Sequence, residues 1–217
     1  MNTKLSYKSL AGAAVMAVLV VSVPAALIAT APAAQAQSGD MAAAVAALRG
    51  VSTMRANFVQ TDRNGKRLGG VMTLKRPGRI RFQYAKGVPF LIVSDGAAFT
   101  FVDYQVRQVQ RWPIRNSPLG ALLDPTRDVA KYGKLVPVGS RNIVSVEVRD
   151  NSHPEFGIIT LVFVRKASAP GGLELTSWAA LDSQKTLTRV NLSNHQYGIA
   201  VPDNAFKFND PRPANRR

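Results

Sequence analysis

Few side chains in this 217-residue sequence could carry out chemistry. The chain has no cysteine and only two histidines, His153 and His195, which stand far apart in the sequence, so we expect loop or surface histidines and no metal site. Acidic residues are few and scattered, which gives little support to catalysis by paired carboxylates. The sequence contains no nucleophile elbow and no glycine-rich phosphate loop. We therefore predict a binding protein without catalytic residues, metal or cofactor, and not an enzyme.

Arg76 draws attention because it precedes Pro77 and Gly78 in the turn between two apolar segments. An arginine side chain has five donors in a planar fork, so one residue can engage several carbonyl oxygens at once. From the residues alone, the simpler interpretation of Arg76 is an exposed arginine before a turn proline. Its role depends on the elements that surround it.

Most of the chain alternates between apolar and polar residues in short segments, which is typical of β-strands. Asn64-Gly65 and Asp95-Gly96 are strong signals for tight hairpin turns. Because no helix of crossover length separates the first strands, they should pair as an antiparallel meander. The segments predicted as strands are 54–61, 66–74, 79–85, 89–94, 97–104, 106–112, 144–150, 157–164, 173–181, 186–197 and 205–208.

Three helices interrupt this pattern. The first is predicted over 40–50, with Asp40 as the N-cap and an apolar stripe formed by Met41, Val45 and Leu48. Two short helices are predicted in mid-chain, one opening at Ser117-Pro118 and one at Asp124-Pro125. A sheet of this size curls, and the helices have its open mouth to cover. The predicted fold class is mainly β (α+β): an incomplete antiparallel barrel of about ten or eleven strands that encloses a hydrophobic cavity beneath an N-terminal helix and short lid helices.

The N-terminus has the layout of a secretory signal peptide. Lys4 and Lys8 precede a long apolar run, which ends near the small-x-small site Ala34-Gln35-Ala36. We predict cleavage after Ala36, which makes 1–36 a signal peptide and 37–217 a single domain; an uncleaved membrane anchor is the alternative. The natural compartment for such a chain is a bacterial periplasm. The tail after Phe208 is polar, and we expect it to be frayed.

The chain is strongly basic, with a formal net charge of +15, which becomes 15 − 2 = +13 when Lys4 and Lys8 are removed. Export argues against nucleic acid as the partner of this charge. Outside the cytoplasm the obvious anions are membrane headgroups, so we expect transient contact with an anionic membrane surface. The equally weighted alternative is an ordinary solvated surface.

Several segments in order resemble the periplasmic lipoprotein carrier proteins of the LolA family. The resemblance begins at "MRANFVQ" and is strongest in "LKRPGRIRFQY" and "LIVSDGAAFTFVDYQVRQVQ". "NSPLGALL" is similar to the short lid helix of the family, and "TLTRVNLSNHQYGIAVPDNAFKF" is similar to its final strands. Each piece is weak alone, but their order and spacing make a chance match improbable. The tail is shorter than in well-studied members, and the strong basicity is not general to the family.

The resemblance implies a monomeric carrier that takes acylated lipoproteins from an inner-membrane ABC transporter to an outer-membrane receptor, or directly to the outer membrane. It also implies that Arg76 latches the empty cavity by bonding carbonyls near Leu48 and near Ala121, Leu122 and Leu123. The side chains expected to line the cavity, or else to form ordinary core, are Phe58, Phe82, Leu91, Val93, Phe99 and Phe101. Two alternatives stay open on the same scaffold: a carrier or sensor of a glycolipid or phospholipid, and an envelope-stress or assembly interaction module.

Overall fold

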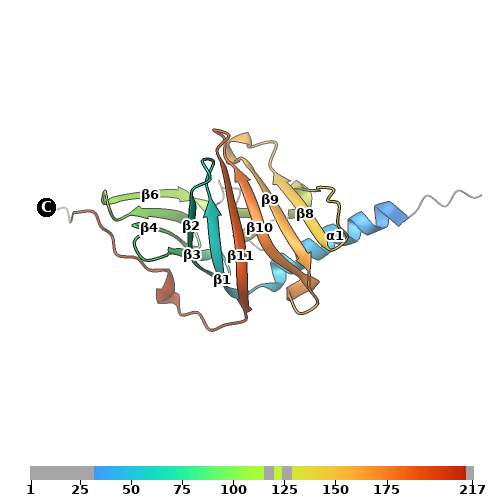
Figure 1. The fold of residues 1–217 in the computed structure, drawn as a ribbon, viewed down its shortest axis with the longest axis horizontal. Helices are drawn as coiled ribbons and strands as arrows, with labels where there is room; N and C mark the ends of the chain where they lie inside the picture. The colour runs from blue at the N-terminus through green and yellow to red at the C-terminus, as the bar shows by residue number, and fades with distance from the viewer. Residues whose placement is uncertain (1–31, 115–119, 124–128, 214–217) are drawn as a thin grey trace, which may run out of the picture. The chain divides into compact units, whose positions relative to one another are not determined.

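A single open sheet of eleven antiparallel strands dominates the structure (Figure 1). The computed structural model describes residues 32–114, 120–123 and 129–213. The strands are β1 (Thr53–Thr61), β2 (Arg67–Lys75), β3 (Arg79–Tyr84), β4 (Phe90–Asp95), β5 (Ala98–Asp103), β6 (Gln108–Pro113), β7 (Gly133–Leu135), β8 (Ile143–Arg149), β9 (Ile158–Arg165), β10 (Leu173–Leu181) and β11 (Leu187–Tyr197). The helices are α1 (Pro32–Gly50), α2 (Gly120–Leu123) and α3 (Val129–Tyr132), with 3-10 turns η2 (Pro154–Phe156), η3 (Pro170–Gly172) and η4 (Asp203–Phe206).

The strands lie in the order β6-β5-β4-β3-β2-β1-β11-β10-β9-β8-β7, so the first and last strands pair in the middle. The two edges, β6 and β7, come from the middle of the chain and do not pair with each other. The sheet nevertheless curls strongly. Three strands lie between β3 and β10, yet the ring of Phe82 on β3 contacts the ring of Trp178 on β10, with centroids 6.1 Å apart. The predicted incomplete antiparallel barrel is confirmed.

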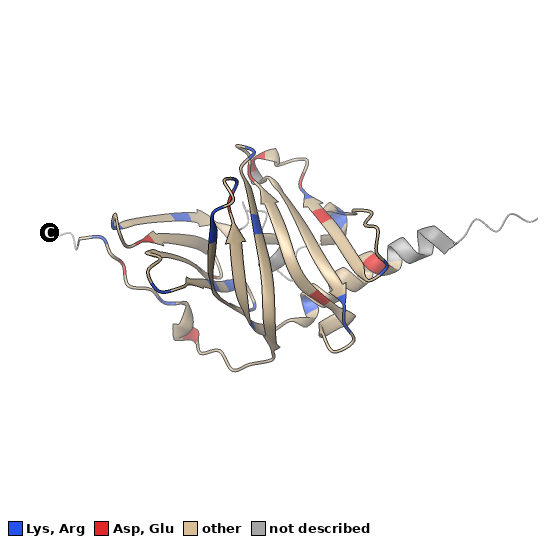
Figure 2. Cartoon of the chain, viewed as in Figure 1, with Lys and Arg blue, Asp and Glu red and all other residues tan. Residues whose placement is uncertain are grey.

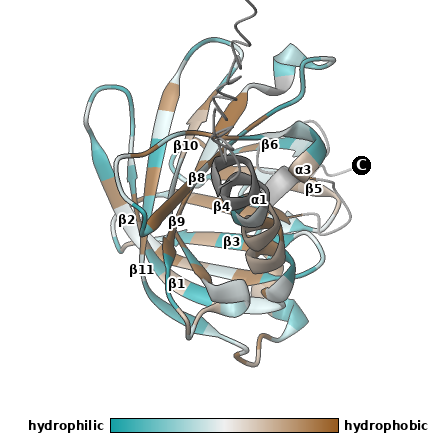
Figure 3. Cartoon of the chain, turned by 90° about the vertical axis from the view of Figure 1, so that its right-hand side faces the viewer, coloured by the Kyte–Doolittle hydropathy of each residue, from teal (hydrophilic) through white to brown (hydrophobic). Residues whose placement is uncertain are grey.

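Helix α1 lies against the inner face of the sheet, where it contacts β7, β8 and β10 (Figure 3). Its innermost side chains, Ala44, Ala47 and Leu48, are buried. The η3 turn also approaches this helix closely at Gly171, where a Cβ atom would lie 2.5 Å from the backbone nitrogen of Ala47. The helix is therefore held on two sides, by the sheet and by η3.

The apolar side chains form two separate clusters on the two faces of the sheet. The larger cluster fills the concave face and includes α1, the inner strand positions and Leu123 of α2. The smaller cluster contains Leu91, Val93 and Val102 from β4 and β5, together with Val201 and Phe206 from the C-terminal segment. Both faces of β4 and β5 are thus covered.

The segment after β11 crosses β3 and β4 and is fixed there by cations on the outer face of the sheet. Lys75 and Arg79 both place a side-chain nitrogen 2.6 Å from Oδ1 of Asp203, whose pKa is held below its usual value mainly by the hydrogen bond from Lys75 and the charge of Arg79. Arg81 donates hydrogen bonds to the carbonyls of Lys207 and Ala205, at 2.9 and 3.3 Å. We call residues 199–208 the C-terminal strap.

Four details differ from the predictions. The predicted strand at 205–208 is wrong, because Ala205 and Phe206 belong to the 3-10 turn η4, and the short strand β7 was not predicted. Asp40 is not an N-cap, since α1 begins at Pro32 and the carboxylate of Asp40 pairs with Arg165 at 2.5 Å. His195 is not a surface residue: its side chain is only 3% exposed. The helix starts predicted at Ser117 and Asp124 lie outside the described residues.

Candidate functional site

Aromatic side chains fill the concave face of β1 to β3. The ring of Phe58 lies over Gly70 of the neighbouring strand, where a Cβ atom would come within 2.8 Å of Cε1 of that ring. Phe58 makes edge-to-face contacts with Phe82 and Tyr84, with ring centroids 5.2 and 5.1 Å apart. Burial raises the pKa of Tyr84 to about 12, and its hydroxyl donates to Oε1 of Gln60 at 2.7 Å. Gly70 thus provides the space that these rings occupy.

The structure divides the six residues that the sequence predicted as cavity lining. Phe58, Phe82 and Phe99 lie in the inner cluster, beneath the helices. Phe101 is half-buried, and its ring lies 5.6 Å from that of Phe90. Leu91 and Val93 are placed on the opposite face, under the C-terminal strap.

The residues of β4 that contact the inner cluster are instead Phe90 and Ile92. Register explains the difference: Ile92 pairs with Phe82 on one side and with Phe101 on the other, so these three side chains share the concave face. All four consecutive residues from Phe90 to Val93 are apolar, so alternation alone could not choose between the two faces.

Arg76 lies at the mouth of the concave face, in the turn between β2 and β3, and its peptide bond to Pro77 is cis. Its Nη1 atom donates a hydrogen bond of 3.2 Å to the carbonyl oxygen of Leu123, the last residue of α2. The backbone N–H of Gly78 donates to the same oxygen at 3.3 Å. The backbone N–H of Arg76 donates to Ser52, just after α1, at 2.8 Å. One turn therefore holds the end of α2 and the segment that follows α1.

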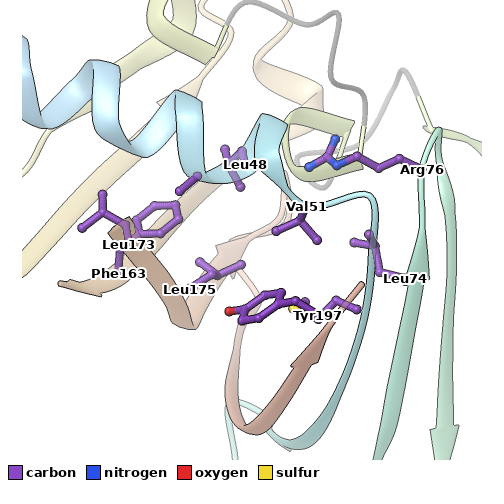
Figure 4. A pocket seen from close by; sticks show the side chains of 10 residues that line it. Leu48, Val51, Leu74, Arg76, Phe163, Leu173, Leu175 and Tyr197 are labelled. Carbon is purple, nitrogen blue, oxygen red and sulfur yellow. The ribbon is translucent and has the colours of Figure 1, made fainter. Parts of the chain in front are cut away.

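A small apolar cavity of about 20 Å³ lies between α1 and the sheet, beside this turn (Figure 4). Leu48 and Val51 line it from the α1 side, whereas Leu74, Leu175 and Tyr197 line it from the strands. Arg76 lines its rim. This volume suits about one water molecule, so α1 packs closely on the sheet at this point.

The residues predicted as partners of Arg76 differ in how they lie relative to its side chain. Leu123 is brought to it by the hydrogen bond above, and the side chain of Leu123 is buried in the inner cluster. Leu48 and Arg76 line the same cavity. Ala121 and Leu122 belong to α2, but their side chains lie outside the described residues.

Sequence reasoning missed a second set of contacts that hold α1. Asp40 pairs with Arg165 at the end of β9, and Gly171 in the following turn lies against Ala46 and Ala47. The pair Gly171-Gly172, with both residues at positive φ, was the available signal for a turn at close approach.

A polar network lies next to the cavity and includes Tyr197. Glu174, on β10, accepts a hydrogen bond of 2.8 Å from Lys166 and one of 3.4 Å from the hydroxyl of Tyr197. Burial, and then the charge of Glu174, raise the pKa of Tyr197. The ring of His195 stacks on Tyr197 and bonds the carbonyl of Leu175 at 2.9 Å. These bonds engage the polar groups of Glu174, His195 and Tyr197 beside the cavity.

A covered half-barrel with an apolar concave face is typical of proteins that bind apolar ligands. Comparisons with known proteins identify the family within this class. The family model described as outer membrane lipoprotein carrier protein LolA matches residues 49–209. An outer-membrane lipoprotein carrier protein from Chromobacterium violaceum is 32% identical over 200 residues, which cover 87% of this chain and 92% of that protein. One from Xanthomonas campestris pv. campestris is 37% identical over 172 residues, covering 74% and 79%.

This chain belongs to the LolA family. Among solved structures, a LolA superfamily protein from Nitrosomonas europaea is 10% identical, with a TM-score of 0.45, covering 79% of this chain and 97% of that one. Within residues 32–114, 120–123 and 129–213, no helix has the length and apolar character needed to cross a bilayer.

Proposed function

We propose that this protein is a periplasmic carrier of acylated lipoproteins. The observation that carries the proposal is the covered concave face itself: a continuous apolar surface whose cover is attached at a few polar contacts, in a chain of the LolA family. Its donor would be an inner-membrane lipoprotein-releasing ABC transporter. Its acceptor would be an outer-membrane receptor or the outer membrane itself.

The free energy of exposing an acyl chain sets what such a carrier must do. Burial of acyl chain is worth about 0.8 kcal/mol per CH₂, so a chain of about sixteen carbons costs on the order of 10 kcal/mol to expose to water. A soluble carrier must therefore give the acyl chain most of the apolar contacts that the bilayer provided. The inner cluster, with Phe58, Phe82, Phe99 and their neighbours, offers apolar surface of this kind.

The space between α1 and the sheet must widen before an acyl chain can enter there, because the cavity at that place has a volume of only about 20 Å³. In the proposed cycle, the acyl chain displaces α1 and α2 and takes over the apolar contacts of Leu48 and Leu123. The cover then competes with the cargo for the same surface, which favours release without a bound nucleotide.

The latch must be weak enough to open. A hydrogen bond from a charged donor contributes about 1.5–3 kcal/mol, and a neutral one about 1 kcal/mol. The bonds from Arg76 and Gly78 to the Leu123 carbonyl are of this size, small beside the gain from burying a whole acyl chain. Arg76 therefore biases the empty protein toward the covered state and does not prevent loading.

The decisive experiment compares Arg76→Leu with Arg149→Leu, an exposed arginine at the end of β8 that serves as the matched control. Loading is measured as a soluble complex with a purified acylated lipoprotein, and handover as transfer of that lipoprotein to outer-membrane vesicles. We expect Arg76→Leu to load but to retain its cargo, because the empty covered state has lost its latch. Arg149→Leu should do both like the wild type.

Two results would count against the proposal. Normal handover by Arg76→Leu would remove the latch from the mechanism. Native mass spectrometry of protein taken directly from the periplasm tests the cargo: a bound mass equal to a free glycolipid or phospholipid, with no acylated protein, would replace the lipoprotein carrier with a carrier of another lipid.

A further inference from the structure

Five cations gather at the tips of two neighbouring hairpins: Arg63, Lys66, Arg67, Lys185 and Arg189. We call these residues the basic tip. The hairpins are neighbours because β1 and β11 pair along their length, with Thr61 opposite Arg189 on one side and opposite Arg67 on the other. Blue segments mark this end of β2 and β11 in Figure 2. All five residues are exposed.

The acidic residues of these hairpins are engaged by the backbone. Oδ1 of Asp62 accepts hydrogen bonds from the N–H groups of Asn64 and Lys66, at 2.8 and 2.9 Å. Oδ1 of Asp182 accepts one from the N–H of Thr186 at 2.7 Å. Within the part of the chain that the structure describes, no cation of the basic tip has a carboxylate oxygen within 4.0 Å. The two aspartates therefore shape the turns, and the tip keeps a net positive charge.

The strand register brings like charges together. Arg67 and Arg189 flank Thr61 on the same face of the sheet, two strand spacings or roughly 10 Å apart. That separation is slightly longer than the Debye length of about 8 Å at physiological ionic strength, so the repulsion between the two charges is weak there and grows as salt is removed. A surface with many anionic groups would attract both cations at once.

The composition of the tip favours a lipid surface over a protein. Protein interfaces depend on buried apolar and aromatic anchors, and their cores are depleted in lysine. The hairpin tips have no such anchor among the described residues, because the exposed large apolar side chains, Val71, Tyr104, Val106, Trp112 and Val138, all lie outside 61–67 and 182–189. Flexible cations without an apolar centre suit phosphate-bearing headgroups, which need no shape complementarity.

We propose that the basic tip binds the anionic headgroups of a membrane surface. The geometry leaves the cover free, because β2 runs from Arg67 at the tip to Lys75 beside the latch, a length of roughly 25 Å. A protein docked through the tip thus holds Arg76 and the helices away from the lipid plane, where they can open toward a partner. This inference does not depend on what the concave face carries.

The test measures binding of cargo-free protein to vesicles by cosedimentation, with phosphatidylcholine alone or with about one-third phosphatidylglycerol. The tip variant carries Arg63→Gln, Lys66→Gln, Lys185→Gln and Arg189→Gln. The matched control carries Lys86→Gln, Lys134→Gln, Arg141→Gln and Lys207→Gln, four exposed cations outside the tip, so both variants lose the same charge. Circular dichroism establishes that both are folded.

We expect the wild type and the control to bind only the anionic vesicles, and binding to weaken as salt is added. The tip variant should bind them roughly three orders of magnitude more weakly, since each of the four cations near an anionic surface changes the partition about fivefold. Equal losses in both variants would show that total charge matters and would overturn the proposal. So would a wild type that ignores anionic vesicles while the tip variant still slows handover, a result that would assign the tip to a protein partner. Lipoprotein loading in solution is measured separately, so failure here leaves the carrier function standing.

Discussion

The two ends of the sheet use the same residue types in opposite ways. At the end that carries the latch, the cations are engaged inside the fold: Lys75 and Arg79 with Asp203, Arg165 with Asp40, and Arg76 with the Leu123 carbonyl. At the hairpin end, the described cations of the basic tip have no carboxylate partner. The first arrangement attaches movable pieces to the sheet, and the second leaves charge available to something outside the protein.

The largest expected contrast between the ends comes from two glycines with similar backbone angles. Gly171 and Gly65 have φ values of +64° and +79°, but a Cβ atom would meet the α1 backbone at Gly171 and open space at Gly65. Gly171→Ala should cost about 2–5 kcal/mol of unfolding free energy, from left-handed strain and overpacking together. Gly65→Ala should cost only the strain, about 1–2 kcal/mol. Urea denaturation measures both, and equal losses would mean that η3 does not hold α1.

The interior near the hairpin end should respond to high pH. Tyr84 has a pKa of about 12 in the folded protein, against about 10 in an unfolded chain, because burial favours its neutral form. The neutral Tyr84 hydroxyl therefore contributes fully to the free energy of unfolding below pH 10, and this contribution is lost as the pH rises through 12. The loss at pH 11 is about 1.4 kcal/mol. Tyr84→Phe should lack this component when the unfolding free energy is followed from pH 9 to pH 11. An unchanged pH dependence in that variant would show that this end is less tightly packed than its burial indicates.

The smallest expected effect is that removing an arginine changes the free energy of unfolding in opposite directions at the two ends of the sheet. Arg189→Gln should raise the unfolding free energy at low ionic strength by no more than about 0.5 kcal/mol, because it relieves repulsion with Arg67. Arg165→Gln should lower it by about 0–1 kcal/mol, because Asp40 loses its partner. Thermal unfolding of both variants at low and at molar salt provides the measurement. Both differences should shrink at molar salt, and a destabilising Arg189→Gln would argue against uncompensated charge at the tip.

The sequence predicted most of the sheet, because clean alternation and Asn-Gly or Asp-Gly turns carry a strong local signal. It failed where that signal is missing. Strand β7 is only three residues long, and the segment from 205 to 208 has a strand-like composition but forms a turn that packs on the outer face. The early start of α1 was missed because residues 32–36 have the pattern of a signal-peptide cleavage site, and Asp40 is a residue type that favours N-caps.

The site was predictable only in part, and for a similar reason. The proximity of Arg76 and Leu123 followed from a resemblance, since no local pattern links a turn to a helix 47 residues away. Leu91 and Val93 were predicted to line the cavity because every residue from Phe90 to Val93 is apolar. The sequence pattern of such a strand does not indicate which side chains face the concave side of the sheet. Only the C-terminal strap, which was predicted to end in a strand at 205–208, reveals that the outer face of β4 is buried as well.

The central pairing of β1 with β11 has a consequence for how the chain acquires its structure. Each half of the sheet is a succession of neighbours, β1 to β6 and β7 to β11, whose contacts are local and form quickly. The junction between the halves closes a loop that spans nearly the whole polypeptide, the slowest kind of contact to form. A nascent chain that still lacks β11 therefore has β1 as an unpaired strand edge, which can pair with another chain and aggregate, until the last strand arrives.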